Sequence, residues 1–289
     1  MDGAAAPADG LVSPHLAGLP IYKMTGSGND FVMVDGRVSA PEDWSAADIR
    51  AACARGTGVG ADGVVFVLPG SAAGSVRMIY FNSDGSRAAM CGNAALCSTR
   101  LAPRLGLSGA DGMRLETDSG AYDSRPSPTA DMAELHLAPV APPWEVPQVK
   151  LTSGERRLAQ AMVGVPHLVL VVDDVDQVDL INRGRELRSH PAVGPDGANV
   201  NFLSPAAGSG GWRMRTYERG VEAETLACGT GSVAAACALD LWELSHLPTV
   251  IHTRSGRHLE VRATRRPGGD YGDVWLIGEA RMVFRGVLS

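Results

Sequence analysis

Short apolar runs separated by polar turns alternate along the chain, and these runs are of two kinds. Runs rich in β-branched residues at 64–67, 169–172 and 274–277 predict strands, because such side chains suit a pleated, half-buried surface. Residues 43–55 and 180–189 instead repeat their apolar positions at the spacing of an amphipathic helix. Asp-Gly pairs and clusters of proline separate the segments. The pattern predicts a mixed α/β (α+β) fold.

Two further segments are apolar nearly all round. Residues 94–101 and 232–241 are rich in Ala, Leu and Cys and predict buried helices, because a surface helix would carry a polar face. Each segment follows a Cys-Gly pair, Cys91-Gly92 in the first half of the chain and Cys228-Gly229 in the second.

The chain also repeats itself. Four short motifs recur in the same order, at separations between 134 (59 to 193) and 138 (29 to 167). The matches are 28–35 with 165–173, 59–63 with 193–197, 80–93 with 217–230, and 117–120 with 253–256. A period this long excludes a solenoid and predicts two domains of similar fold, related by a pseudo-twofold axis.

This repeat divides the chain into segments. We expect an N-terminal domain at 21–147 and a C-terminal domain at 148–275, with the Pro-rich stretch 139–147 as the linker. Residues 276–289 are expected to form a closing strand that returns to the N-terminal domain. Residues 1–20 are rich in Ala, Pro and Gly and are expected to form a disordered tail.

Composition narrows the possible partners. The chain has 289 residues, 45% of them hydrophobic, which suffices to bury a core. Its 26 basic and 32 acidic residues give a net charge of −6, with no basic patch for nucleic acid or an anionic membrane. No apolar run approaches the roughly 18 residues needed to cross a bilayer, and the N-terminus lacks the basic region of a signal peptide. We expect a cytoplasmic protein with a small-molecule partner.

The five cysteines are an odd number at wide spacings, with no CxxC pair. This pattern favours neither a metal site nor a disulfide framework, so free thiols in a reducing compartment are expected. Cys53, Cys97 and Cys237 fall inside predicted helices and are expected in the core.

Cys91 and Cys228 precede the two buried helices, where unpaired backbone N–H groups and the positive end of the helix dipole meet. Such a position lowers the pKa of a thiol and suits a substrate carboxylate, which glycine allows to approach closely. Two such thiols facing one carbon from opposite sides could remove an α-proton and replace it on the other face. We therefore predict an enzyme that inverts a stereocentre.

Other interpretations of the two thiols stay open at this point. A single cysteine before a helix is more often a packing residue than a catalytic one. A thiol–disulfide redox protein would also use two cysteines, and a binding module on the same fold would use neither for chemistry.

Several blocks then resemble a known family. Residues 26–31 (GSGNDF), 81–86 (FNSDGS), 90–93 (MCGN), 217–220 (YERG) and 224–231 (ETLACGTG) resemble the signature blocks of the diaminopimelate epimerases, from about Ile21 to Gly286. The resemblance implies a homodimeric, cofactor-independent and metal-independent isomerase that interconverts LL- and meso-diaminopimelate in lysine and peptidoglycan-precursor synthesis. It also implies two domains, each a β-barrel-like sheet around a central helix.

The resemblance further implies roles for individual residues. Cys91 and Cys228 would be the acid–base pair, and His167 and Glu218 would tune their pKa values. The backbone N–H groups that hold the reacting carboxylate would belong to Gly92, Asn93, Gly229 and Thr230. The remaining amino and carboxylate groups would be bound by Asn29, Asn82, Asn199, Glu218 and Arg219.

Some positions depart from the family pattern. Val165 stands where an asparagine is common, which removes one amide from the distal end of the substrate site. Gly63 replaces a glutamine, Ala94 replaces a glycine, and the stretch 221–224 is one residue longer than its commonest form. A related two-thiol racemase acting on proline, hydroxyproline or histidine is therefore the alternative within enzymes.

Overall fold

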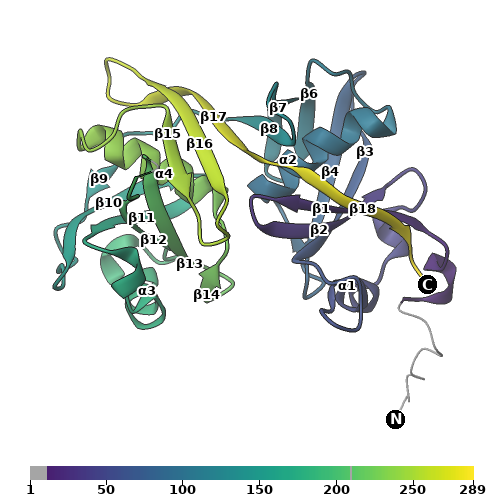
Figure 1. Cartoon of the computed structure of the whole chain (residues 1–289), viewed down its shortest axis with the longest axis horizontal. Helices are drawn as coiled ribbons and strands as arrows, with labels where there is room; N and C mark the ends of the chain where they lie inside the picture. Colours follow the sequence, from purple (N-terminus) through teal and green to yellow (C-terminus); the bar gives the residue numbers. More distant parts are fainter. Residues whose placement is uncertain (1–11, 209) are drawn as a thin grey trace, which may run out of the picture. The chain divides into compact units, whose positions relative to one another are not determined.

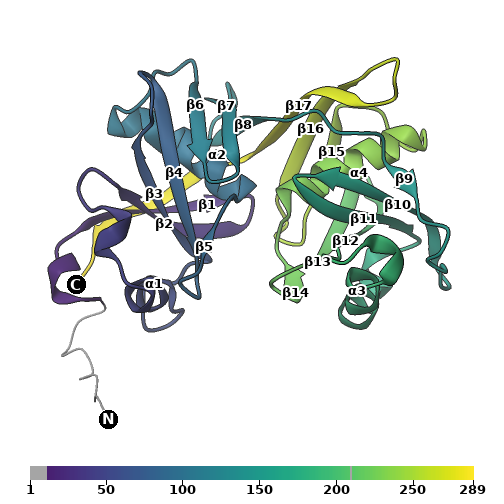
Figure 2. The ribbon, with the colours of Figure 1, turned by 180° about the vertical axis from the view of Figure 1, so that it is seen from behind.

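The computed structural model describes residues 12–208 and 210–289 (Figures 1 and 2). Within this range the chain forms two compact units. Unit 1 comprises the described residues up to Ala133 together with Ala280–Ser289, and unit 2 comprises Glu134–Glu279. Each unit mixes strands with a few helices, which confirms the predicted fold class.

Unit 1 contains two α-helices, α1 and α2, among its strands. Its elements are β1 (Pro20–Gly26), β2 (Asn29–Asp35), α1 (Ala46–Cys53), β3 (Gly63–Pro69), β4 (Ser75–Asn82), β5 (Arg87–Ala88), α2 (Gly92–Leu101), β6 (Met113–Thr117), β7 (Gly120–Pro126), the first part of β8 (Met132–Leu137) and β18 (Arg281–Val287), with 3-10 turns at Pro14–Leu16, Pro41–Asp43 and Ala102–Leu105. The last strand, β18, runs antiparallel to β1.

The strands of unit 1 pair in a fixed series. β1 and β2 form an antiparallel hairpin, and β3 then lies parallel to β2 after a crossover through α1. β4 is antiparallel to β3 and β5, and β6 lies parallel to β4 after a crossover through α2. Helix α2 packs against β1, β2, β3, β4, β6 and β7, so the strands surround it.

Unit 2 contains the helices α3 and α4. Its elements are the rest of β8, β9 (Trp144–Glu145), β10 (Glu155–Val163), β11 (Val165–Val172), α3 (Leu180–Arg188), β12 (Asn199–Pro205), β13 (Trp212–Glu218), β14 (Ala223–Thr225), α4 (Gly229–Leu241), β15 (Thr249–His252), β16 (His258–Arg265) and β17 (Tyr271–Glu279), with 3-10 turns at Val175–Gln177 and Pro191–Val193.

The pairing series of unit 1 recurs in unit 2. The hairpin β10–β11 leads through α3 to the parallel strand β12, which is antiparallel to β13. β13 pairs antiparallel with β14, and the chain crosses through α4 to β15, parallel to β13. Helix α4 packs against β10, β11, β12, β15, β16 and β17. The two halves of the sequence therefore adopt similar folds, each with its Ala-rich helix at the centre.

The helix predicted at 43–55 is shorter in the structure, where α1 spans only Ala46–Cys53. A 3-10 turn occupies Pro41–Asp43, and Ser45 then caps α1. The Asp48 N–H donates to Ser45 Oγ at 3.1 Å, and the Ser45 N–H donates to Asp48 Oδ2 at 2.9 Å. This reciprocal capping box sets the helix start at Ala46.

The predicted disordered tail needs a correction. Residues 1–11 lie outside the described residues, but from residue 12 onward the chain packs on unit 1. Val12, Leu16 and Leu19 are buried in its hydrophobic core, together with Leu288. Their apolar side chains outweigh the Ala, Pro and Gly content on which the prediction rested.

The stretch 139–147, predicted as a linker, is instead part of unit 2. Val140 and Tyr271 exchange backbone hydrogen bonds of 2.9 and 2.8 Å, and Trp144–Glu145 pairs with β10. Val146 is buried in the unit 2 core. Proline is tolerated along a sheet edge, where its missing N–H is not needed, so a Pro-rich composition did not mark a linker here.

Candidate active site

Cys91 and Cys228 are the N-cap residues of the two central helices, α2 and α4. Both have extended backbones, and their carbonyl groups accept the first helical hydrogen bonds, from Ala95 at 2.9 Å and Ser232 at 3.0 Å. Neither thiol caps its helix. The first N–H groups of each helix, those of Gly92 and Asn93 or of Gly229 and Thr230, are the groups that a helix leaves for an outside acceptor.

The other three cysteines have a different environment. Cys53, Cys97 and Cys237 are buried, as predicted for core residues. Burial raises the pKa of Cys53 and of Cys237 to about 12, so both remain thiols at neutral pH. Cys91 is half-buried and Cys228 is 7% exposed.

In unit 1, a chain of side-chain amides leads away from Cys91. Asn93, the second residue of α2, donates from Nδ2 to Asn29 Oδ1 at 2.6 Å, and Asn29 Nδ2 donates to Asp62 Oδ2 at 2.9 Å. Arg55 pairs with Asp62 at 2.7 Å. The structure thus brings Asn29 and Asn93 together beside the helix start. The Asn93 Oδ1 atom is buried without a hydrogen-bond partner in the described structure.

A charged cluster holds this amide chain in place. Lys23 is buried and pairs with Asp30 at 2.6 Å, and Arg55 also pairs with Asp30 at 2.6 Å. Burial acts to raise the pKa of Asp30, but hydrogen bonds and charge from Arg55 and Lys23 outweigh it and lower that pKa. Asp30 therefore stays ionised, and its ion pairs with Lys23 and Arg55 hold the strand that bears Asn29.

In unit 2, His167 occupies the place that the repeat assigns to Asn29. Its Nε2 atom lies 3.0 Å from Thr230 Oγ1, and Thr230 Oγ1 lies 3.8 Å from Cys228 Sγ. On the other side of the ring, Asn201 Nδ2 lies 3.3 Å from His167 Nδ1.

The remaining bonds of Asn201 define the proton positions in this relay. Its Oδ1 accepts from Thr216 Oγ1 at 2.9 Å, so its Nδ2 faces the ring and also donates to the Leu168 carbonyl. Because Nδ1 of His167 accepts, its proton is assigned to Nε2, which donates to Thr230. The Thr230 hydroxyl is then oriented to donate to Cys228 Sγ, which favours the thiolate.

His167 is neutral at physiological pH. Full burial, with a smaller contribution from the charge of Arg219, lowers the pKa of His167 to about 3. Its contact with Thr230 is therefore that of a neutral imidazole and not of a cation.

Asn199, Glu218 and Arg219 form a second group in unit 2. The Arg219 N–H donates to Asn199 Oδ1 at 2.8 Å, and its Nη1 reaches the Asp196 carbonyl at 3.4 Å. Burial raises the pKa of Glu218. The parallel pairing of β11 and β12 places Asn199 opposite His167.

Asn82 pairs with Gly63, the neighbour of Asp62 in the chain. It ends β4 and donates to Ser86 Oγ at 3.0 Å within its own turn. The sequence analysis did not predict Arg55, Asp62 and Asn201. Asp62 contacts Asn29, Arg55 contacts Asp62, and Asn201 contacts His167. A usable signal existed for Asp62, because it lies in one of the four repeated motifs.

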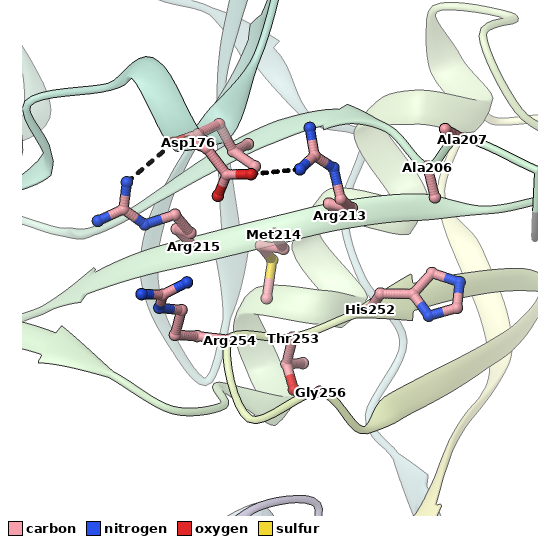
Figure 3. Close-up of a pocket in the computed structure, with 11 residues that line it drawn as sticks. Asp176, Ala206, Ala207, Arg213, Met214, Arg215, His252, Thr253, Arg254 and Gly256 are labelled. Carbon is pink, nitrogen blue, oxygen red and sulfur yellow. Dashed lines mark hydrogen bonds and ion pairs between the residues drawn. The ribbon is translucent and has the colours of Figure 1, made fainter.

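Unit 2 also carries a hollow of about 560 Å³ (Figure 3). It is lined by Arg213, Arg215 and Arg254 among others, and by none of the predicted site residues. Arg213 pairs with Asp174 and Asp176 at 2.6 Å each, so part of its charge is balanced within the protein.

Between residues 12 and 289, Ser209 aside, no three His, Cys, Asp or Glu side chains gather in a way that could hold a metal ion. Over the same range, no helix is both long and apolar enough to cross a membrane.

Known proteins match this chain over nearly its whole length. The family model described as diaminopimelate epimerase matches residues 21–127 and 159–282. A diaminopimelate epimerase from Gemmatimonas aurantiaca is 45% identical over 283 residues, covering 94% of this chain and 99% of that protein. One from Aquifex aeolicus is 38% identical, covering 94% and 98%.

A solved structure shares the fold at low sequence identity. The crystal structure of a phenazine biosynthesis protein of the PhzF family from Bacillus anthracis matches with a TM-score of 0.72 at 14% identity. The match covers 94% of this chain and 99% of that one, which supports the two-unit fold alone.

The buried neutral His167 predicts a specific pH dependence of stability. Its pKa is about 3 in the folded chain and about 6.5 when unfolded, so the unfolded chain binds an extra proton between these values. The free energy of unfolding should therefore fall by about 2 kcal/mol from this group between pH 7.5 and pH 5. In His167→Asn, urea unfolding should show a fall smaller by that amount. The control is His15→Asn, at an exposed position, and an identical pH dependence in His167→Asn and the wild type would contradict the assignment.

Gly231 allows the relay to approach Cys228. A Cβ at this position would lie 2.4 Å from Asn201 Oδ1 and 3.1 Å from Cys228 Sγ, so Gly231→Ala should displace one or both. We expect alkylation of Cys228 by iodoacetamide, mapped by mass spectrometry, to slow by about tenfold as thiolate support is lost. Gly109→Ala is the matched control, because nothing lies within 4 Å of its added Cβ. Equal alkylation rates in the two variants would show that Gly231 has no such role.

Proposed function

The chain belongs to the diaminopimelate epimerase family, and we propose that it interconverts LL- and meso-diaminopimelate by proton transfer between Cys91 and Cys228. The observation that carries the proposal is the repeated construction of one chemical environment. In each unit, a Cys-Gly pair begins the central helix of a strand-surrounded fold.

The proposed reaction uses the two thiols in opposite protonation states. One thiolate removes the α-proton of the substrate and becomes a thiol, while the other thiol delivers its proton to the opposite face and becomes a thiolate. The stereocentre is inverted, and the reverse reaction starts from the exchanged states. No electrons leave the substrate, so the step needs no redox partner.

Removal of an α-proton leaves negative charge that spreads onto the substrate carboxylate. Backbone N–H groups of Gly92 and Asn93, and of Gly229 and Thr230, belong to the first turns of α2 and α4. Donors already fixed at a helix N-terminus stabilise developing charge without reorganising. We assign the carboxylate of the reacting centre to these groups.

The rest of the substrate would meet the polar residues at the strand ends. Arg219 suits a bidentate grip on a carboxylate, and Glu218 suits an ammonium group. Asn29, Asn82 and Asn199 supply amides for the remaining contacts. The buried Asn93 Oδ1 atom has no hydrogen-bond partner in the described structure. It can accept a hydrogen bond from a substrate ammonium group.

Glu218 and His167 are proposed to tune the two thiols by different routes. His167 acts on Cys228 through the Thr230 hydroxyl, as the distances of 3.0 and 3.8 Å allow. Glu218 has a raised pKa because it is buried, so it can carry a proton closer to neutral pH than an exposed glutamate.

We also propose that the enzyme is a cytoplasmic homodimer. The five cysteines stand at wide spacings with no CxxC pair, and a reducing compartment preserves thiols of this kind. Val283, Phe284 and Val287 on β18 are exposed apolar side chains of the kind that a partner subunit covers.

Replacing either proposed acid–base thiol should disable the reaction. We expect Cys91→Ser and Cys228→Ser each to lower kcat by at least about a thousandfold, because a hydroxyl is a far weaker acid than a thiol near neutral pH. Cys97→Ser, in the middle of α2, is the matched control for a buried cysteine that the reaction does not use. A coupled assay that detects meso-diaminopimelate formation measures the rates. Full activity in either of the first two variants would end the two-thiol model.

Substrate choice separates this function from that of a related racemase. Incubated in deuterated water with LL-diaminopimelate, L-proline, hydroxyproline or L-histidine, the enzyme should incorporate deuterium only into diaminopimelate. The reason is that Asn199, Glu218 and Arg219 offer charged and amide groups to a second amino-acid head. Exchange into proline or histidine without exchange into diaminopimelate would overturn the substrate assignment.

A further inference from the structure

The two units carry ion pairs of opposite polarity at matching positions. Four residues before each proposed catalytic cysteine stands a charged side chain, Arg87 before Cys91 and Glu224 before Cys228. The repeated Thr-x-Ser-Gly motif supplies the second member, Asp118 in unit 1 and Arg254 in unit 2. The strand residue is basic in unit 1 and acidic in unit 2, and the turn residue has the opposite sign in each case.

In unit 1 the pair is tight. Arg87 Nε donates to Asp118 Oδ2 at 2.6 Å and its Nη2 donates to Asp118 Oδ1 at 2.9 Å, a bidentate contact. Arg77 on β4 also pairs with Asp118, and its Nη1 donates to the Thr117 carbonyl at 2.8 Å. The turn between β6 and β7 is thereby joined to β4 and to β5, the strand that leads into Cys91.

In unit 2 the acidic member sits on the strand instead of the turn. Glu224 on β14 accepts two hydrogen bonds from Arg215, of 2.7 and 2.9 Å, and lies 3.8 Å from Arg254 Nε. Figure 3 shows Arg215 on β13 and Arg254 on the turn after β15 extending toward the same end of the hollow. The Ser255 N–H of that turn donates to the Leu226 carbonyl at 3.1 Å, two residues before Cys228.

We propose that Arg87–Asp118 and Glu224–Arg254 are positioning pairs, which hold the segment entering each cysteine at the angle that the proton transfer requires. The proposal rests on the acid–base role assigned above to Cys91 and Cys228. Only three residues separate each charged strand residue from its cysteine, so a shift of the strand moves the sulfur. A misplacement of about 1 Å at a reacting atom can cost about a hundredfold in rate.

A contribution to stability explains these pairs poorly. Arg87 and Arg254 are 45% and 55% exposed, and ion pairs at such exposure contribute at most about 1 kcal/mol. Independent drift of the two halves would leave like charges at some of these positions. Although the signs of the charges differ between the units, each strand residue still attracts the residue on its turn. This is expected if the pairs hold the strand in a fixed position.

The proposal can be tested by giving the pair in unit 1 the charge order of the pair in unit 2. Arg87→Glu and Asp118→Arg each place like charges together, whereas the double variant gives unit 1 the polarity that unit 2 already has. We expect each single variant to lower kcat for LL-diaminopimelate about tenfold with KM little changed, and the double variant to recover most of the loss. Arg114→Glu is the control, because it also places like charges together, beside Asp123, but at a more exposed position of the same β6–β7 hairpin, and it should leave kcat unchanged.

Alkylation of Cys91 by iodoacetamide gives a readout that a loss of fold alone does not explain. In folded single variants its rate should change severalfold while that of Cys228 does not, and the double variant should restore it. Wild-type kcat in both single variants, a double variant no better than the worse single one, or lost kcat with unchanged Cys91 alkylation would each overturn the proposal. Absence of epimerase activity in the wild type would instead contradict the proposed function and leave the alkylation comparison readable.

Discussion

The structure depends on one constraint, that a cysteine with an extended backbone must stand directly before a buried helix. The first turn of α2 or α4 leaves backbone N–H groups for an outside acceptor, and neither Cys91 nor Cys228 uses its side chain to satisfy them. A helix end of this kind binds an anion and favours a thiolate at the same place. Placing it there requires a helix with no polar face, and strands on all sides cover that helix in each unit.

The two units support their cysteines with different chemistry on the same scaffold. In unit 1, an ionic base of Lys23, Asp30 and Arg55 fixes an amide chain from Asp62 to Asn93. In unit 2, a buried neutral relay runs from Asn201 through His167 to Thr230. We propose that this difference tunes the two thiols separately, although one arrangement of strands and helices underlies both.

Sequence patterns predicted the parts of this architecture that depend on local chemistry. The apolar segments at 94–101 and 232–241 lie within α2 and α4, and the Cys-Gly pairs stand at their starts, because a continuous apolar segment is a local property of the sequence. The contribution of Val12, Leu16 and Leu19 to the core was missed, since it depends on a surface that distant strands create. Asp62 and Asn201 were missed for the same reason, because their contacts with the predicted residues Asn29 and His167 join positions 33 and 34 residues apart along the chain.

The central claim concerns where two sulfur atoms stand relative to one carbon. A crystal structure of the enzyme with a non-reactive diaminopimelate analogue measures this directly. We predict Cys91 Sγ and Cys228 Sγ on opposite faces of the analogue's α-carbon, each at about 3–3.5 Å, with the carboxylate on the N–H groups of α2 and α4. Sulfur atoms in separate pockets, or both on one face of that carbon, would contradict it.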